Sequence, residues 1–144
     1  MANEAVIIEL FGEPKGQVLR FAVPNAYAVE KGTLMAFSGA AARTVSKNIE
    51  GTVGAPFAGV AAEEKVTSDG STSMGVYTKG VFDLAYTANT VAVVPGDMVI
   101  LSGANKVTRC PDSFSGSHMG WVVGKVLEPV AAAASDTVAV QIGG

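Results

Sequence analysis

A short pattern of turn and apolar residues occurs twice in this chain, and this repeat constrains the fold more than any other feature. Segment 30–40 has the order turn, strand, turn, and segment 95–104 has the same order. The matched positions, all at one constant separation, are Gly32 and Gly96, Leu34 and Met98, and Ser38-Gly39-Ala40 and Ser102-Gly103-Ala104. Several matches at one separation indicate two copies of a structural unit. Coincidence is the alternative, because Gly, Ala, Val and Ser are abundant in the chain.

The repeat continues beyond these segments. Phe57 and Trp121 keep the same separation, and the glycines and glutamates that follow them are displaced by one position. Each copy then has a polar gap and a strand, which we predict over 75–82 in the first copy and 136–142 in the second. In the last strand Val or Ile alternates with Thr, Ala or Gln. This alternation is typical of a half-buried strand.

The repeated unit is built from strands and turns. Pro95-Gly96-Asp97 suits a type II turn, because Pro fixes φ at the first central position and Gly supplies φ > 0 at the second. Flanking β-branched and aromatic residues favour strands. The expected repeats cover about 29–84 and 93–144. Two copies are too few for a solenoid, so we predict an all-β fold, a small β-barrel or sandwich of two pseudo-repeated strand–turn–strand units.

The N-terminal segment precedes the repeat. An apolar run at 6–11 is ended by Gly12-Glu13-Pro14-Lys15-Gly16, and a second possible strand at 17–23 is closed by Pro24. Pro and Gly breaks this close together argue against a helix. Two interpretations are open: ordinary strands of the core, or an extended arm that is ordered by a neighbouring molecule. We expect an N-terminal arm at 1–24 and a β-rich body at 25–144.

Composition limits the classes of function. The chain has 144 residues, enough for one self-supporting domain. Only 16% of the residues are charged and 49% are hydrophobic, which predicts an oligomer or a partner surface. The formal net charge is −3 and no basic cluster is present, which argues against nucleic acid as a partner. Cys110 is the single cysteine, so we expect no intrachain disulfide.

We expect no signal peptide at the N-terminus. The first ten residues include two glutamates, where a signal peptide needs positive charge. No uninterrupted apolar run approaches the roughly 18 residues of a membrane span. We therefore expect synthesis in a cytosol and no membrane partner.

Two segments are similar to known functional sites, a phosphate-binding loop and a zinc site, but lack residues that those sites need. The segment 120–125 is one residue short of a phosphate-binding loop, and Val126 stands where such a loop needs Ser or Thr. Cys110, Asp112 and His118 lie in one loop, but a zinc site needs three or four ligands at fixed distances. The chain has no second His or Cys. We therefore expect no metal and no cofactor.

The sequence evidence for catalytic groups is equally weak. Ser113 or Ser115 could form a triad with His118 and Asp112, but a flexible loop lacks the preorganised geometry that such catalysis requires. The remaining candidate carboxylates, which stand at strand ends and turns, are Glu63, Glu64, Asp83 and Asp97. Their scatter predicts solvated charges, and we expect no enzymatic activity.

Other stretches carry a family resemblance. Residues 57–64 (FAGVAAEE) and then 75–82 (GVYTKGVF) resemble the head-decoration, or capsid cement, proteins of tailed bacteriophages, which have a small-hydrophobic-Gly-hydrophobic-Ala strand and then a Tyr-Lys-x-Gly-x-Phe strand. A related, longer group of phage cement proteins has Gly-Asp-x-Val, a Lys-Val-Thr turn, a Gly-containing strand and a final valine-rich strand. The similar segments here are Pro95-Gly96-Asp97-Met98-Val99, Lys106-Val107-Thr108, 120–126 and 137–142. The resemblance covers about 29–142 and leaves 1–23 outside.

The resemblance implies a virion protein without catalysis. Proteins of this kind are mostly small β-structures on the capsid surface, commonly trimers at local threefold positions, which clamp neighbouring capsomers. It therefore implies the major capsid protein as partner, a homo-oligomer with a trimer favoured, and synthesis in the host cytoplasm. Another virion component (tail, fibre or baseplate) and a ligand-binding β-barrel are the alternatives.

An N-terminal segment often makes the shell contact in such proteins. We accordingly expect the apolar part of that contact to come from Val6, Ile7, Ile8, Leu10 and Phe11. A strand added to the edge of a neighbour's sheet would gain backbone hydrogen bonds. Removing residues 2–16 is then expected to abolish shell binding.

Overall fold

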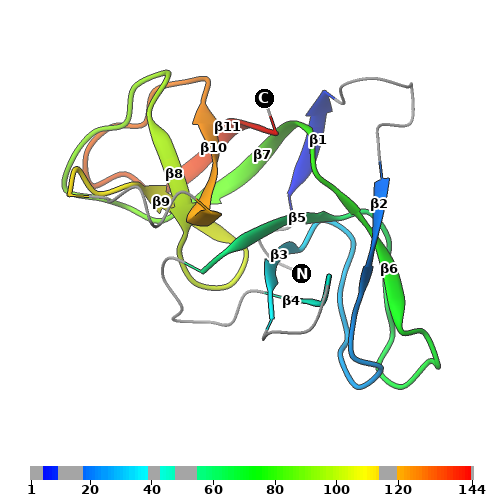
Figure 1. The fold of residues 1–144 in the computed structure, drawn as a ribbon. Coiled ribbons are helices and arrows are strands. Elements are labelled where there is room, and N and C mark those ends of the chain that lie inside the picture. Colours follow the sequence, from blue (N-terminus) through cyan, green and yellow to red (C-terminus); the bar gives the residue numbers. More distant parts are fainter. Residues whose placement is uncertain (1–4, 10–17, 39–42, 48–54, 114–119, 144) are drawn as a thin grey trace.

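The computed structural model describes residues 5–9, 18–38, 43–47, 55–113 and 120–143 (Figure 1). These residues form eleven β-strands joined by turns and loops, which confirms the predicted all-β class. The strands are β1 (Val6–Glu9), β2 (Val18–Ala22), β3 (Leu34–Phe37), β4 (Val45–Lys47), β5 (Phe57–Ala61), β6 (Ser73–Tyr77), β7 (Gly80–Tyr86), β8 (Met98–Leu101), β9 (Lys106–Arg109), β10 (Val122–Val126) and β11 (Asp136–Ile142).

The second half of the chain forms a closed barrel, here called the C-terminal barrel. Its strands follow the order β7-β11-β10-β8-β9, and β9 pairs in parallel with β7 to close the ring. One edge of β7 pairs with β11 along its whole length. The other edge is shared, with β1 alongside Val81–Asp83 and β9 alongside Ala85 and Tyr86. Strand β1 is therefore an addition at the edge of this sheet.

The first half forms a five-stranded antiparallel sheet, here called the N-terminal sheet, in the order β2-β6-β5-β3-β4. Its two edge strands approach each other at a single parallel bridge between Ala22 and Thr44. The backbone N–H of Ala22 donates to the carbonyl oxygen of Arg43 at 2.8 Å. The sheet is therefore curled in the same direction as the barrel.

The two halves have the same strand order and many equivalent backbone hydrogen bonds, with the pair β2–β6 equivalent to the pair β7–β11. The N–H of Gly32 donates to Ala61 O at 2.8 Å, and the N–H of Gly96 donates to Val126 O at 2.8 Å. Both glycines have φ near +90°, at +90° and +98°. A hydrogen bond from Asp97 N–H to Val94 O, at 3.1 Å, closes the turn around Pro95-Gly96, as expected for type II. Reciprocal backbone bonds further join Val29 to Lys65 and Val93 to Val130.

The pairing pattern places two segments differently from the boundaries predicted above. The expected strand 75–82 is divided between β6 and β7, which lie in different sheets. Strand β7 occupies the place of β2 and so begins the second unit, whereas the expected repeat 29–84 would have ended with it. Strand β2 belongs to the N-terminal sheet although it lies before residue 25. Within this chain, then, β1 and β2 are strands of the two sheets.

The hydrophobic core has two parts. Phe82, Leu101 and Val140 lie in the C-terminal barrel, and their cluster continues onto Leu34 and Val60 of the N-terminal sheet. A second cluster fills the curled N-terminal sheet and contains Phe21, Val23, Val29, Met35, Val45, Ala58, Ala61, Met74 and Val76. Strands β3 and β5 are therefore buried on both faces. Figure 1 shows β5 crossing the end of the barrel.

One glycine in each half lets two strands approach closely. Gly59 lies opposite Met35 and Gly124 lies opposite Val99, each beside a β-bulge. A Cβ at Gly59 would collide with the carbonyl oxygen of Tyr77, and one at Gly124 with that of Gln141. These glycines are required by packing.

We predict that Gly59→Ala and Gly124→Ala each lower the free energy of unfolding by about 1–3 kcal/mol, because the new methyl group meets backbone that cannot move away. Gly120→Ala is the matched control, since a Cβ there meets nothing within 4 Å. Urea denaturation followed by circular dichroism measures all three. Equal stability of Gly59→Ala and Gly120→Ala would contradict the packing role.

Candidate functional site

The loop after β9 holds the candidates for metal binding and nucleophilic catalysis. Arg109 Nη2 donates to Asp112 Oδ1 at 2.8 Å, and its Nε lies 3.7 Å from Asp97 Oδ2. Burial raises the pKa of the Cys110 thiol above its ordinary value, which favours the unreactive protonated form. A shallow cleft of about 270 Å³ is lined by these residues together with Gly96, Met98 and Pro111.

These candidates do not form a site among the residues that the structure describes. Asp112 is held by Arg109, and Ser113 is exposed. His118 and Ser115 lie outside the described residues. Across the described ranges, no group of three His, Cys, Asp or Glu side chains could hold a metal ion. In the segment 120–125, Gly124 lies within β10, and its role there is close strand packing.

The carboxylates singled out in the sequence are spread over the surface. Glu63 Oε1 accepts from Arg20 Nη1 and from the N–H of Gly75, both at 2.8 Å, and Glu64 is exposed. Asp97 Oδ2 accepts from the N–H of Val94 in the turn before β8. These groups fix turns and strand ends, and the structure does not bring them together as an acid–base pair.

Asp83 has a different environment. It lies on β7 opposite Val6 of β1 and Ala139 of β11. Burial raises the pKa of its carboxyl above the ordinary value, and the negative charges of Glu128 and Asp136 add to the effect. Glu128 itself accepts a hydrogen bond from the N–H of Ala139 at 2.9 Å. The outside of the barrel beside β1 is therefore acidic.

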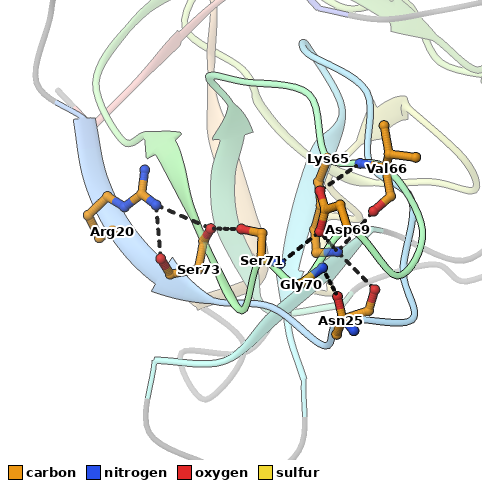
Figure 2. A network of polar contacts seen from close by, with 8 residues as sticks. All are labelled: Arg20, Asn25, Lys65, Val66, Asp69, Gly70, Ser71 and Ser73. Atoms are coloured by element: carbon orange, nitrogen blue, oxygen red, sulfur yellow. Dashed lines mark hydrogen bonds and ion pairs between the residues drawn. The ribbon is translucent and has the colours of Figure 1, made fainter.

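Figure 2 shows the most developed polar network, which lies beside the N-terminal sheet. Its centre is Lys65, whose side chain is only 2% exposed. The ammonium donates to Asn25 O at 2.9 Å, to Val66 O at 3.2 Å and to Asp69 Oδ1 at 3.0 Å. Three acceptors match the three donors of the ammonium, so this buried charge is fully used inside the chain.

Asp69 completes the network. Its carboxylate also accepts from the N–H of Ser71 at 2.8 Å and from the N–H of Val66 at 3.1 Å. The hydrogen bond from Ser71, followed by that from Lys65, holds the pKa of Asp69 below its ordinary value. Asn25 Oδ1 accepts from the N–H of Gly70 at 2.8 Å. The network therefore ties the loop after β2 to the loop between β5 and β6. Its chemistry is structural.

The surface offers apolar side chains in place of a polar active site. Val6, Ile7 and Ile8 of β1 are exposed, although β1 is held by β7 and by a hydrogen bond from Ala5 N–H to Gly32 O at 2.7 Å. Leu10 and Phe11, expected in the same contact, lie outside the described residues. Other exposed large apolar residues are Val18, Leu19, Tyr27, Phe37, Val66, Val91, Val94, Met98 and Leu127.

Sequence reasoning singled out β1 but missed the remaining exposed apolar residues and the buried Lys65. The comparison of the two units could have singled out Lys65, because the residue at the equivalent position of the second unit, Val130, is apolar and buried. A lysine at the repeat position of a buried valine indicates an internal charge with fixed partners.

We predict that Asp69→Asn reduces the loss of stability on acidification. A carboxylate whose folded pKa is lowered stabilises the fold above its ordinary pKa, and this contribution is lost as the pH falls through the lowered value. Urea midpoints between about pH 5 and pH 2 should fall less steeply in Asp69→Asn than in the wild type. Glu64→Gln, at an exposed neighbour, is the control. An unchanged pH dependence in Asp69→Asn would contradict this role.

Within the described ranges, no helix has the length and apolar character needed to cross a membrane. The chain is similar to a solved structure, the N base of the head fiber gp8.5 in bacteriophage phi29. The identity is 16% over 88% of this chain and 93% of that chain, with a TM-score of 0.47. A comparison with curated proteins finds no match.

A family model described as phage cement protein matches residues 14–142. The match begins earlier than the resemblance at 29–142 predicted from motifs, and it includes β2, the first strand of the repeated unit. It spans both sheets and leaves β1 outside. Because the match covers most of the sequence, the chain belongs to the phage cement protein family and is a structural protein that decorates the phage capsid.

Proposed function

We propose that the chain binds the outside of the phage head, bridges neighbouring copies of the major capsid protein and so stabilises the shell. It acts by binding, without catalysis or a cofactor, and as a homo-oligomer, with a trimer favoured. Family membership supports the capsid as its location. The observation that carries the contact is β1, an edge strand whose three consecutive apolar residues, Val6, Ile7 and Ile8, are exposed.

The geometry of β1 suits a contact with another protein. An edge strand presents unpaired backbone groups to which a neighbour's strand can be added. Pairing with β7 already fixes the strand, so binding does not have to order a disordered segment, and the entropic cost of association falls. Val6 and Ile8 are the most exposed of the three apolar residues of β1, at 61% and 50%, and Ile8 lies at a β-bulge between Ile7 and Glu9. Leu10 and Phe11 extend the same apolar stretch in the sequence.

Bridging follows from the number of contacts each particle makes. A cement protein that holds two capsomers resists their separation, and an oligomer holds several seams at once. Because all contacts must break before the oligomer leaves, modest individual affinities combine into stable attachment.

A ligand-binding barrel has less support. The interior of the C-terminal barrel is occupied by its own side chains, and Phe82, Leu101 and Ile142 are fully buried there. Small-molecule sites need an open cavity lined by a few convergent polar groups. The cleft beside Arg109 is shallow, and its charged groups are already paired with each other.

We predict that Val6→Thr combined with Ile8→Thr weakens binding to phage heads at least tenfold, because it removes apolar area from the two most exposed apolar side chains of β1. Threonine keeps the β-branched shape that favours a strand, so the circular dichroism melting curve should be unchanged. These substitutions test the contact more cleanly than removal of residues 2–16, which would also delete a strand paired with β7.

The matched control is Val91→Thr combined with Val94→Thr, which changes two exposed valines in the loop before β8. Heads purified without the protein are incubated with each variant, sedimented and then heated. Wild type and control should bind and raise the temperature at which heads release DNA, while the β1 variant should do neither. Full binding by the β1 variant would contradict the contact, and binding by wild type without a gain in heat resistance would contradict bridging.

A further inference from the structure

One surface of the N-terminal sheet is covered inside the chain. Leu34 and Val60 form a cross-strand pair on the outer face of this sheet, and their side chains are 0% and 1% exposed. They join the hydrophobic cluster of the C-terminal barrel. The N–H of Leu34 donates to Asn105 Oδ1, in the turn between β8 and β9, at 3.0 Å. This outer face therefore rests on the end of the barrel that carries the turn between β8 and β9.

The equivalent face of the C-terminal barrel is uncovered. Met98 and Lys125 form the cross-strand pair that corresponds to Leu34 and Val60. Met98 is 39% exposed, and Lys125 is exposed as well. Because the backbone pairing is the same in both halves, the difference in burial comes from what lies on the face. In the first unit that is the other half of the chain, whereas in the second unit Met98 and Lys125 stay exposed and none of the described segments covers this face in the same way.

The ends of the two units differ in the opposite sense. At the covered end of the C-terminal barrel, Phe82 and Leu101 are buried and belong to the same hydrophobic cluster as Leu34 and Val60. Their counterparts in the N-terminal sheet, Leu19 and Phe37, have equivalent cross-strand partners and are exposed by 44% and 46%. The N-terminal sheet thus exposes two large apolar side chains that the other unit buries.

We propose that copies of this chain associate head to tail, with the exposed end of the N-terminal sheet in one copy covering the outer face of the C-terminal barrel in the next. Leu19 and Phe37 would then meet the face that carries Met98 and Lys125. The intermolecular contact repeats the contact between the two halves of one chain. We assign a second copy to the exposed face because the chain itself already contains one contact of this kind, between its N-terminal sheet and its C-terminal barrel.

A contact of this kind uses two different surfaces of each copy, so it closes into a ring when the rotation between copies allows it. The open face is more polar than its buried counterpart, with Met98 and Lys125 in place of Leu34 and Val60. A face of this polarity keeps the separate chain soluble before assembly, as do the interfaces of chains that fold separately. The inference specifies the surfaces of the homo-oligomer in the proposed function, and it is tested without capsids.

The test places a charge on each surface separately. The full chain is compared with Leu19→Glu, Met98→Glu and, as control, Val91→Glu, which lies on a different exposed loop. Analytical ultracentrifugation gives the mass of each, and circular dichroism verifies folding. Wild type and control should sediment as oligomers, whereas Leu19→Glu and Met98→Glu should approach the monomer mass of 14.6 kDa.

Mixing the two variants tests the head-to-tail geometry. Leu19→Glu retains an intact barrel face and Met98→Glu retains an intact sheet end, so an equimolar mixture should form dimers that cannot grow further. A monomeric wild type, dissociation of the control, or a mixture that stays monomeric would each overturn the proposal. The sedimentation masses do not depend on β1. If the Val6 and Ile8 variant still binds heads, the shell contact is contradicted while the head-to-tail association is not, so the two proposals are tested independently.

Discussion

The structure depends on two strands that are buried on both faces. Met35 of β3 points into the core of the N-terminal sheet, while its neighbours Leu34 and Ala36 join the core that continues into the C-terminal barrel. Strand β5 divides its side chains in the same way. Because each apolar side chain removed from water contributes about 1.5–3 kcal/mol, this shared layer couples the two halves. Gly59 allows the layer to form, since a side chain there would push β5 away from β6.

Charge has a supporting role in this chain. With few charged residues, most of the loop geometry comes from backbone hydrogen bonds, and the buried Lys65 is an exception with three fixed partners. Removing one partner of such a group leaves an uncompensated buried charge, which is far more costly than losing a surface pair. The Arg20 pair with Glu63 is exposed and contributes little by comparison. The network therefore gives the loop after β2 one defined conformation.

The class of fold could be predicted from the sequence because strand and turn signals are local. The positive φ of Gly96 follows from a Pro-Gly turn, and alternation in the last strand follows from its half-buried position. The assignment of strands to sheets could not be predicted in the same way. Thr78 and Lys79 interrupt an apolar run, but only long-range pairing sends β6 and β7 into different sheets. The exposure of Leu19 was equally hidden, since its counterpart Phe82 is buried in an equivalent position.

The two units have the same backbone and different surfaces, and this difference bears on how a decoration protein works. A chain with two identical halves would use its matching surfaces on itself or on any copy without distinction. Here Leu34 and Val60 are buried between the two halves, whereas Met98 and Lys125 are exposed at the equivalent positions, and the proposed contact between copies uses this exposed face. Strand β1 is added to the C-terminal barrel alone, and it lies beside the acidic surface around Asp83. In the proposed assembly, self-association and shell contact use separate faces, so a copy can join its neighbours and the capsid together.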